Sequence, residues 1–375
     1  MSETNRAVKG TCDVLPSESY KWQFVEKRML ETARLYGFNE IRIPVFEHTE
    51  VFLHSVGDTT DVVQKEMYTF DDKGGRSITL RPEFTAGVIR SAIEKGLVNG
   101  ALPVKAAYVG GCYRYEKPQA GRLREFHQFG VECIGAASPS ADAEVIALAK
   151  HVLDAVGIEK ISLEINSIGC PECRKDYLEK VKECLTNLNI TYEVNPRIVR
   201  GLDYYTRTVF EFVSGDIGAQ STVCGGGRYD GLISQMGGPS TASLGFAMGI
   251  ERIMLLLEAQ GTELPRPDYC DLYIATMGEN AGVAATGICE LLRKDGFKVQ
   301  TDICGRGLKA QMKFADKTGA RFTMVLGDNE CESGNAKIKN MQSGEETEIR
   351  LNEISESLMN IINSAALDEL AESIL

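Results

Sequence analysis

The sequence has no long apolar run and no segment typical of export. No stretch approaches the roughly 18 apolar residues that cross a bilayer, and its first ten residues, MSETNRAVKG, lack the apolar core of a secretory signal. A membrane span is therefore excluded, and a cytoplasmic location is expected. The eleven cysteines are an odd number without a regular framework, so we expect reduced thiols.

The chain also lacks an excess of basic residues. Its 41 Lys and Arg residues stand against 53 Asp and Glu residues, which gives a formal net charge of -12. Such a protein does not hold a polyanion by overall attraction. If it binds nucleic acid, a local basic face must make the contact.

Several common catalytic signatures are missing. The sequence contains no GxxxxGK[ST] loop, no GxGxxG after a strand, no HExxH and no GxSxG. None of the four histidines is spaced like a metal-ligand pair. Cys170 and Cys173 resemble half of a zinc site, but Cys184 is the only cysteine nearby, so free thiols are the favoured interpretation. We expect no tightly bound metal or organic cofactor.

Hydrophobic periodicity outlines the first two thirds of the chain. Apolar residues at three- and four-residue steps predict a helix over 17–36, capped by Ser17 and ended by Gly37. Alternation predicts a strand over 39–47, which should lie at an edge or interface because Pro44 has no N–H to donate. The pattern over residues 104–135 predicts a long hairpin. With shorter strands and a strand that passes directly into a helix at 243–258, the pattern predicts one mostly antiparallel sheet with helices at its sides, an α+β domain.

The pattern of predicted elements changes after residues 259–268, a segment with two prolines and few apolar residues. Strands and helices alternate from residue 270 to residue 327 in a βαβαβ pattern, which predicts a smaller α/β domain. We therefore expect a first domain over 1–260, a linker over 261–267 and a second domain over 268–375.

The hairpin gathers charged and polar residues on one face. Period-two geometry places Arg124, Gln128 and Glu132 of one strand beside Arg114 and Glu116 of its partner. A single alternating strand of this kind is most often a solvated face. Two adjoining strands with both signs of charge and small residues between them predict a polar pocket.

Two further patterns leave alternatives open. The run Gly225–Gly227 lets a backbone pass close to a ligand or to another strand, or it makes a tight turn before a helix. The residues Arg306, Lys309, Lys313, Lys317 and Arg321 recur every three or four positions and predict a basic helix stripe. Such a stripe is usually solvated, but in a chain of net charge -12 it is also a candidate RNA-facing surface.

These motifs together resemble histidyl-tRNA synthetase, a class II aminoacyl-tRNA synthetase, over nearly the whole chain. CYRYEKPQAGRLREFHQFGVE is similar to the second class II motif, SLGFAMGIERIMLLLE to the third, and the segment around Pro44 to the first, which builds the family's dimer interface. TLRPEFTA, VRGLDYYTRTVFE and GGGRYDGL are similar to histidine-specific signatures. The second domain resembles the family's anticodon-binding domain.

The resemblance implies histidine–tRNA ligase activity, with ATP accompanied by Mg²⁺, L-histidine and tRNA(His) as substrates and with a homodimer as the assembly. It implies that Arg114 and Arg200 act on the α-phosphate and that Arg252 meets adenine and the γ-phosphate. Glu132 and Tyr205 would contact the two imidazole nitrogens. The full implied sets are Arg114, Arg200 and Arg252 for catalysis; Arg114, Glu116, Arg122 and Arg252 for ATP; Glu83, Thr85, Gln128, Glu132, Arg200, Tyr204 and Tyr205 for histidine; and Gln119, Arg306, Lys309 and Lys313 for tRNA.

One departure from the family pattern stands out. Members usually carry a helical insertion of several dozen residues before the VRGLDYY signature, and here only about residues 169–191 fill that gap. That insertion clamps the tRNA acceptor stem, so the departure bears on tRNA docking and leaves the adenylation residues untouched. The alternative function is the non-catalytic regulatory subunit of ATP phosphoribosyltransferase, which keeps the fold. That subunit typically lacks the second domain and the ATP-gripping arginines, which this chain retains.

Overall fold

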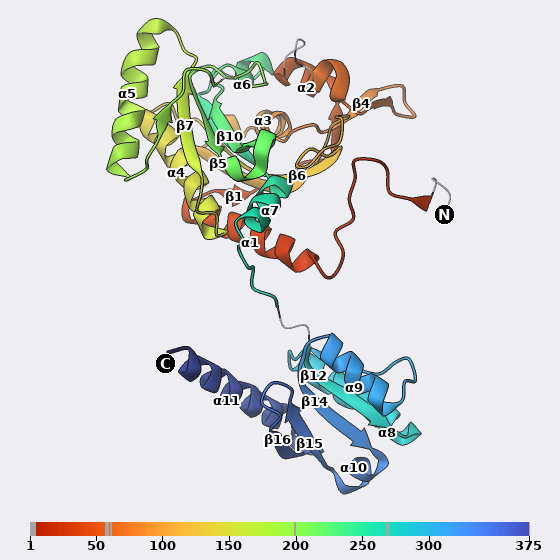
Figure 1. The fold of residues 1–375 in the computed structure, drawn as a ribbon. Helices are drawn as coiled ribbons and strands as arrows, with labels where there is room; N and C mark the ends of the chain where they lie inside the picture. Colours follow the sequence, from red (N-terminus) through yellow and green to blue (C-terminus); the bar gives the residue numbers. More distant parts are fainter. Residues whose placement is uncertain (1–4, 57–59, 61, 199, 268–269, 375) are drawn as a thin grey trace. The chain divides into compact units, whose positions relative to one another are not determined.

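The computed structural model describes residues 5–56, 60, 62–198, 200–267 and 270–374, apart from the side chains of 171–175, 219–220 and 368–374. The chain divides into two compact units, Met1–Pro265 and Arg266–Leu375. Figure 1 shows a mixed sheet covered by helices in each unit. In the part of the chain that is described, no helix is long and apolar enough to cross a membrane.

An eight-stranded sheet forms the centre of the first unit, in the order β1-β5-β6-β11-β10-β9-β7-β8. All of its inner pairings are antiparallel, and the two edge strands pair in parallel. Its strands are β1 (Asn39–Glu40), β5 (Val104–Tyr113), β6 (Glu125–Ile134), β7 (Ser162–Ser167), β8 (Glu193–Val194), β9 (Thr208–Val213), β10 (Thr222–Arg228) and β11 (Ser243–Gly249).

A second, three-stranded sheet corrects the expectation of a single sheet in this unit. It is built from β2 (Phe46–His48), β4 (Ser77–Leu80) and β3 (Thr69–Asp71), in that order. The predicted strand over 39–47 is therefore wrong as one element, because the chain leaves β1 of the large sheet before it enters β2 of the small one. Pro44 lies between the two strands, where a residue without an N–H cannot continue a ladder. The predicted edge position is confirmed, since β1 is an edge of the eight-stranded sheet.

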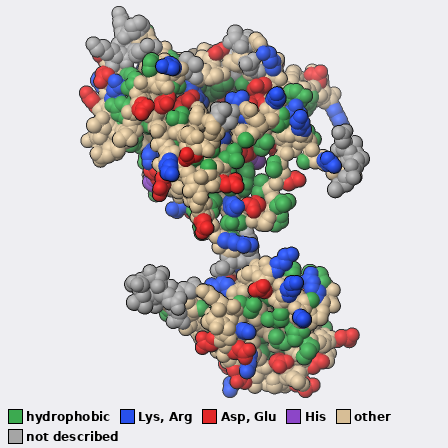
Figure 2. Space-filling model, in the orientation of Figure 1, with side chains coloured by type: hydrophobic (Ala, Val, Ile, Leu, Met, Phe, Trp, Pro, Cys, Tyr) green, Lys and Arg blue, Asp and Glu red, His purple; other side chains and the backbone are tan. Residues whose placement is uncertain are grey.

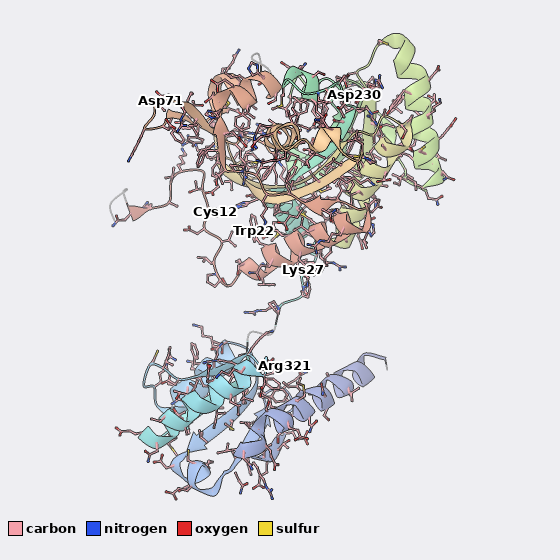
Figure 3. All side chains as sticks on the ribbon, turned by 180° about the vertical axis from the view of Figure 1, so that it is seen from behind. Cys12, Trp22, Lys27, Asp71, Asp230 and Arg321 are labelled. Atoms are coloured by element: carbon pink, nitrogen blue, oxygen red, sulfur yellow. The ribbon has the colours of Figure 1, made fainter. Side chains whose placement is uncertain are left out.

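Seven α-helices and three short helical turns accompany these sheets among the described residues. The α-helices are α1 (Ser19–Leu35), α2 (Thr49–Val56), α3 (Thr85–Glu94), α4 (Pro139–Ala155), α5 (Pro171–Asn187), α6 (Leu232–Gln235) and α7 (Ile250–Ala259), and the turns are η2 (Val62–Glu66), η3 (Leu97–Asn99) and η4 (Gly215–Gln220). The segment that carries Cys12 leads into α1, which bears Trp22 and Lys27 (Figure 3). The expected Ser17 cap is wrong, because Glu18 occupies the N-cap position without a side-chain hydrogen bond.

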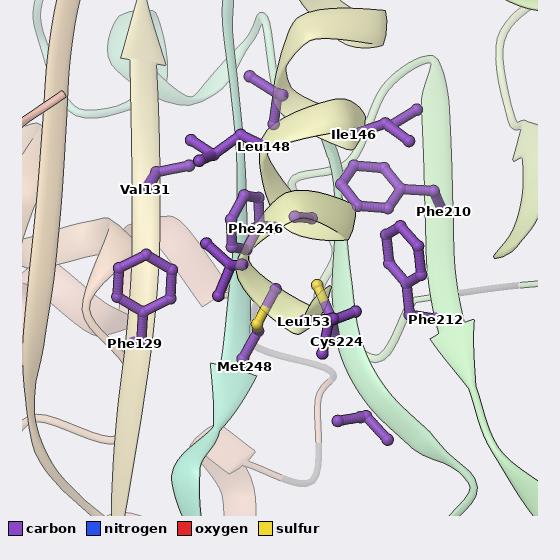
Figure 4. Close-up of a cluster of buried hydrophobic side chains, with 14 of the residues drawn as sticks. Phe129, Val131, Ile146, Leu148, Leu153, Phe210, Phe212, Cys224, Phe246 and Met248 are labelled. Atoms are coloured by element: carbon purple, nitrogen blue, oxygen red, sulfur yellow. The ribbon is translucent and has the colours of Figure 1, made fainter. Parts of the chain in front are cut away.

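The main core lies between α4 and the large sheet. Ile146, Leu148 and Leu153 of α4 pack against phenylalanines of the sheet, among them Phe210 and Phe246 (Figure 4). Each fully buried side chain of this size contributes roughly 1.5–3 kcal/mol relative to exposure. This cluster makes one sheet face rigid and leaves the opposite face, which carries Arg114, Gln128 and Glu132, for polar groups.

The second unit is a five-stranded mixed sheet in the order β13-β12-β14-β15-β16. The predicted βαβαβ part is confirmed by β12 (Cys270–Met277), α8 (Glu279–Lys294), β13 (Val299–Thr301), α9 (Leu308–Lys317) and β14 (Ala320–Gly327), with all three strands parallel. No elements were predicted from the sequence after β14. The structure has α10 (Asp328–Ser333), β15 (Asn335–Asn340), β16 (Glu346–Arg350), η5 (Leu351–Glu353) and α11 (Ile354–Ile374) there.

Candidate active site

A polar cavity of about 410 Å³ lies on the face of the large sheet that α4 does not cover. Its floor comes from β6, β10 and β11, and its walls come from the hairpin loop, the start of α7 and the segment before β9. Residues assigned from the sequence to ATP or histidine line this one space: Glu83, Thr85, Arg114, Glu116, Arg122, Gln128, Arg200, Tyr204, Tyr205 and Arg252.

Three arginines reach this cavity from separate parts of the chain, and each is anchored by the backbone or by an acid. Arg114 follows β5 and donates from Nε to the carbonyl of Pro82 at 2.9 Å. Arg252, in the first turn of α7, donates to the carbonyls of Thr222 at 2.6 Å and Gly121 at 3.2 Å. Arg200 forms an ion pair with Glu211 of β9. Guanidinium groups held in this way present fixed positive charge to the cavity.

Gly225 explains how Arg200 reaches the sheet. A Cβ atom built at this position would overlap the Arg200 guanidinium, so only glycine leaves the room. Gly225 lies within β10, which pairs on both sides with β9 and β11. Of the two interpretations of the glycine run, close approach within a continuous strand is therefore right, and the tight turn is wrong. Arg200 is mostly buried, and its Nε has no hydrogen-bond partner among the described residues.

The hairpin loop places opposite charges at the mouth of the cavity. The Glu116 carboxylate lies 3.8 Å from the Arg114 guanidinium and 3.7 Å from that of Arg122. Burial, followed by the positive charge of Arg122, lowers the pKa of Arg252. All four of these side chains line the cavity.

Glu132 is the buried acid of the site. Its side chain on β6 is only 1% exposed, and Oε1 accepts hydrogen bonds from the Thr85 hydroxyl at 2.7 Å and the Tyr108 hydroxyl at 3.1 Å. Oε2 accepts the hydroxyl of Tyr229. Burial raises the pKa of Glu132 to about 8, although these hydroxyls oppose the rise.

Gly245 makes space for that carboxylate. It faces Glu132 across the β6–β11 pairing, and a Cβ built there would overlap Oε2. Gly245, Thr85 and Tyr229 line the cavity, whereas the Glu132 carboxylate that they contact lies just behind this wall. Three tyrosine rings enclose this part of the cavity, with the centroids of Tyr204 and Tyr205 4.7 Å apart and those of Tyr204 and Tyr229 5.4 Å apart.

Glu83 stands at the start of α3. Its two carboxylate oxygens accept the backbone N–H groups of Thr85 and Ala86, each at 2.7 Å, which satisfies two donors of the first helical turn. Burial raises the pKa of Glu83. Gln128 lies farther along the same cavity, where its side-chain oxygen accepts the Cys112 thiol at 3.3 Å.

Tyr108 and Tyr229 contact Glu132 but were not predicted from the sequence as site residues. Tyr108 on β5 lies six residues before Arg114, which directly follows that strand, so extending the two-residue alternation backward from Arg114 would have reached Tyr108. Tyr229 follows the glycine-rich strand directly, inside a motif already noted for its glycines. Glu211 was missed as well, and only the three-dimensional pairing of β9 with β10 reveals it beside Arg200.

Two residues of the hairpin do not reach the cavity. Arg124 was expected on the pocket face but stacks 3.9 Å from the ring centroid of Tyr115, and it donates to the carbonyl of Glu116. That expectation is wrong because Arg124 precedes β6 and does not follow its alternation. Gln119 lies at the loop tip, paired through its backbone with Arg122, and is not part of the cavity lining.

The basic stripe of the second unit is shorter than predicted. Only Lys309, Lys313 and Lys317 lie on α9, whereas Arg306 precedes the helix and Arg321 lies in β14 (Figure 3). Arg306 bonds to Asp302 and its guanidinium lies 4.4 Å from the ring centroid of Phe314. The helix ends because Gly319 adopts a left-handed conformation after Thr318. Figure 2 shows basic side chains gathered over α9.

The cysteines are not all reduced thiols. Nine are unpaired among the described residues, but Cys170 is disulfide-bonded, so the expectation is wrong at that position. Cys170 lies directly before α5. The side chain of Cys173 falls outside the described part of the structure.

Comparison with known proteins decides the family. A family model described as histidyl-tRNA synthetase matches residues 10–173 and 171–253, and one described as anticodon binding domain matches residues 271–361. The histidine–tRNA ligase of Caldanaerobacter subterraneus subsp. tengcongensis is 48% identical over 414 aligned positions, which cover 95% of this chain and 99% of that protein. The chain belongs to the histidyl-tRNA synthetase family.

Solved structures agree with this assignment. The apo histidyl-tRNA synthetase of S. aureus superposes with a TM-score of 0.86 at 43% identity and covers 94% of this chain and 99% of that one. A structure described as an ATP phosphoribosyltransferase regulatory subunit/histidyl-tRNA synthetase from Bacillus halodurans C has a TM-score of 0.70 at 21% identity and covers 87% of this chain and 99% of that one. The second likeness shows the shared fold alone.

The shortened segment is visible in the same comparisons. The two matches of the histidyl-tRNA synthetase model meet at residues 171–173, where α5 begins. In the Caldanaerobacter alignment, 95% of the 375 residues is about 356, so about 58 of the 414 positions have no residue in this chain. These findings place a deletion relative to the family at the start of α5.

Proposed function

We propose that this chain is a histidine–tRNA ligase that activates L-histidine with ATP and transfers it to the 3′ end of tRNA(His). The observation that carries the proposal is that Arg114, Arg200 and Arg252 line one cavity together with Tyr229, whose hydroxyl contacts the buried Glu132 behind the wall. A nucleotide polyphosphate needs fixed cations, and an imidazole needs paired polar contacts in an otherwise closed pocket. Family membership at 48% identity over nearly the full length supports both assignments.

In the activation step, a carboxylate oxygen of histidine attacks the α-phosphorus of ATP, and pyrophosphate leaves. Negative charge develops on the α-phosphate oxygens as the new bond forms. Arg114 and Arg200 stabilise that charge, and because both are already anchored, little reorganisation accompanies the reaction. Arg252 meets adenine and the γ-phosphate, and Glu116 and Arg122 complete the ATP contacts at the cavity mouth.

Histidine occupies the deeper part of the cavity. Glu132 and Tyr205 contact the two imidazole nitrogens, with Tyr204 beside them. Glu83, Thr85 and Gln128 hold the α-amino group. Analogues without ring nitrogens leave buried polar groups unpaired, which gives discrimination that reaches roughly 10⁴-fold without an editing site.

The tRNA contacts lie in both units. Gln119 at the exposed hairpin tip meets the acceptor stem, and Lys309 and Lys313 on α9, with Arg306 before it, contact the RNA backbone. The match of residues 271–361 to an anticodon-binding model supports a role for the second unit in tRNA binding. We place the domain limits at 1–260 and 268–375 with the linker between them.

ATP would bind together with Mg²⁺. Within the described ranges, no group of three or more His, Cys, Asp or Glu side chains is arranged to hold an ion. The enzyme acts as a homodimer in the cytoplasm. Exposed apolar residues around the three-stranded sheet, Val45, Phe46 and Phe70, support a covered surface there.

Histidine-dependent exchange of labelled pyrophosphate into ATP tests the proposal. We expect exchange with histidine and none without an amino acid. Absence of exchange in folded protein at saturating histidine would favour the regulatory-subunit alternative. Sedimentation of the purified protein tests the dimer separately, since a monomer at micromolar concentration contradicts that part only.

A further inference from the structure

Glu132, the buried acid beside the cavity, has several hydrogen-bond partners within the protein itself. Glu132 accepts three hydroxyl donors, two on Oε1 from Thr85 and Tyr108 and one on Oε2 from Tyr229. An ionised carboxylate offers about four acceptor positions, two on each oxygen. Three are occupied within the protein, so one remains, on Oε2.

Glu132 lies directly behind the cavity wall, because Thr85, Tyr229 and Gly245, which contact its carboxylate, all line the cavity. Oε2 approaches Gly245, which lines the cavity and has no side chain to cover the oxygen. A single acceptor position matches a single N–H donor. This is what one nitrogen of an imidazole ring offers, and it rejects a ring that has only carbon at that place.

Both tyrosines are held rigidly around the acid. Tyr108 is 1% exposed and stacks on Phe84 with ring centroids 4.3 Å apart and planes 7° apart. Gly130 faces Tyr108 across the hairpin, and a Cβ there would overlap its hydroxyl. Tyr229 is also 1% exposed and meets Tyr204 edge to face. Hydroxyls fixed in this way hold the carboxylate in one orientation before the substrate arrives.

We propose that Tyr108 and Tyr229 are positioning residues for histidine selection: their hydroxyls hold the Glu132 side chain in one orientation and, in its ionised form, leave one acceptor, on Oε2, for an imidazole N–H. This inference rests on the proposed function of the cavity. It assigns a role to two side chains that need not touch the reacting groups of either substrate.

The surroundings of Glu132 explain why such help is needed. Burial raises its pKa to about 8, the nearby Glu83 carboxylate adds to the rise, and the hydroxyls of Tyr229, Thr85 and Tyr108 lower it. The charged and titratable groups that interact with Glu132 are Glu83, Tyr108, Tyr204, Tyr205 and Tyr229. Removing one hydroxyl therefore moves the pKa of the acid higher, and a larger fraction of the enzyme is protonated at neutral pH.

The test compares Tyr229→Phe and Tyr108→Phe with the parent by pyrophosphate exchange between pH 7 and 9, where free imidazole is mostly neutral. For Tyr229→Phe we expect a 10- to 100-fold higher KM for histidine at pH 7, the range typical of a hydrogen bond to a charged group. The KM for ATP stays within about twofold. The pH above which the KM for histidine falls moves upward in the variant.

Tyr177→Phe is the matched control, because its hydroxyl also donates to a buried carboxylate, that of Asp142 at 2.7 Å, outside the cavity. It should leave the KM for histidine and its pH profile unchanged. An unchanged histidine KM and pH profile in both cavity variants would overturn the inference, as would an equal rise in the KM for ATP. If Tyr229→Phe does not fold, Tyr108→Phe decides. Absence of exchange in the parent would instead overturn the proposed function.

Discussion

Replacing Arg200 by alanine removes a cation that the structure fixes beside the cavity. Arg200 is paired with Glu211, its side chain is 22% exposed, and Gly225 leaves it the space to approach the sheet. Loss of one preorganised donor to a developing oxyanion typically costs about 10²- to 10³-fold in rate, or roughly 2.7–4 kcal/mol. The variant also leaves the Glu211 carboxylate without the Arg200 cation, which adds unfavourable charge where we propose that the α-phosphate binds. We therefore expect exchange to fall by at least about 10²-fold.

Single-turnover formation of the adenylate is the assay that isolates this step. Arg200→Ala should lower the rate of adenylate formation much more than it weakens binding of histidine or ATP, and the dimer should persist. Arg207→Ala is the control, because Arg207 lies close by in sequence and 3.6 Å from Asp230 but does not line the cavity. A rate within threefold of the parent for Arg200→Ala, in folded protein, would refute the assigned role.

The remaining predictions concern the second unit, the core and the pH dependence of stability. Neutralising Lys309 and Lys313 on α9 should weaken tRNA charging and its salt dependence but spare exchange, and equal loss in both assays would contradict a tRNA contact. Asp142→Asn should cost roughly 1.5–3 kcal/mol in urea unfolding because it removes the nearer of the two carboxylates paired with the fully buried Arg228 and leaves Asp230, whereas Asp154→Asn on the surface should cost well under 1 kcal/mol. The raised pKa of Glu132, about 8, means that its protonation stabilises the fold fully below pH about 4.5, and that this contribution is lost as pH rises through about 8. Glu132→Gln should therefore gain stability relative to the parent between pH 6 and 9, as thermal melts at each pH would show, and a constant difference would contradict the raised pKa.

Local patterns predicted the elements on which the site is built. The alternation along 104–135 gave the hairpin, and the run at 243–258 gave a strand that passes into a helix, as β11 and α7 do. Both are long segments in which one period dominates, so tertiary contacts do not override it. The same period placed Arg114, Gln128 and Glu132 on the open face of the sheet.

Short-range reasoning failed where distant contacts decide the outcome. The segment around Pro44 splits between two sheets, because each half finds a different partner strand, β5 for one and β4 for the other. Arg306 and Arg321 share the spacing of a helix but lie outside α9, whose ends depend on Gly307 and Gly319. No local pattern pairs Arg200 with Glu211 or Tyr229 with Glu132, since sheet pairing creates both contacts.

The deletion at the start of α5 should affect transfer to tRNA but not adenylate formation. Helix α5 packs against the rest of the unit through Tyr177. The Tyr177 hydroxyl donates to the buried Asp142 carboxylate, which also accepts from Arg228. The Arg228 guanidinium lies 5.6 Å from the centroid of the Tyr177 ring. None of the side chains assigned to ATP or histidine belongs to α5, so its length leaves the cavity complete. The resemblance implies that the missing residues clamp the acceptor stem in longer members of the family. Adenylate formation should consequently proceed as in longer relatives, while transfer depends more heavily on Gln119 of the hairpin and on the basic residues of α9, which makes charging the salt-sensitive step.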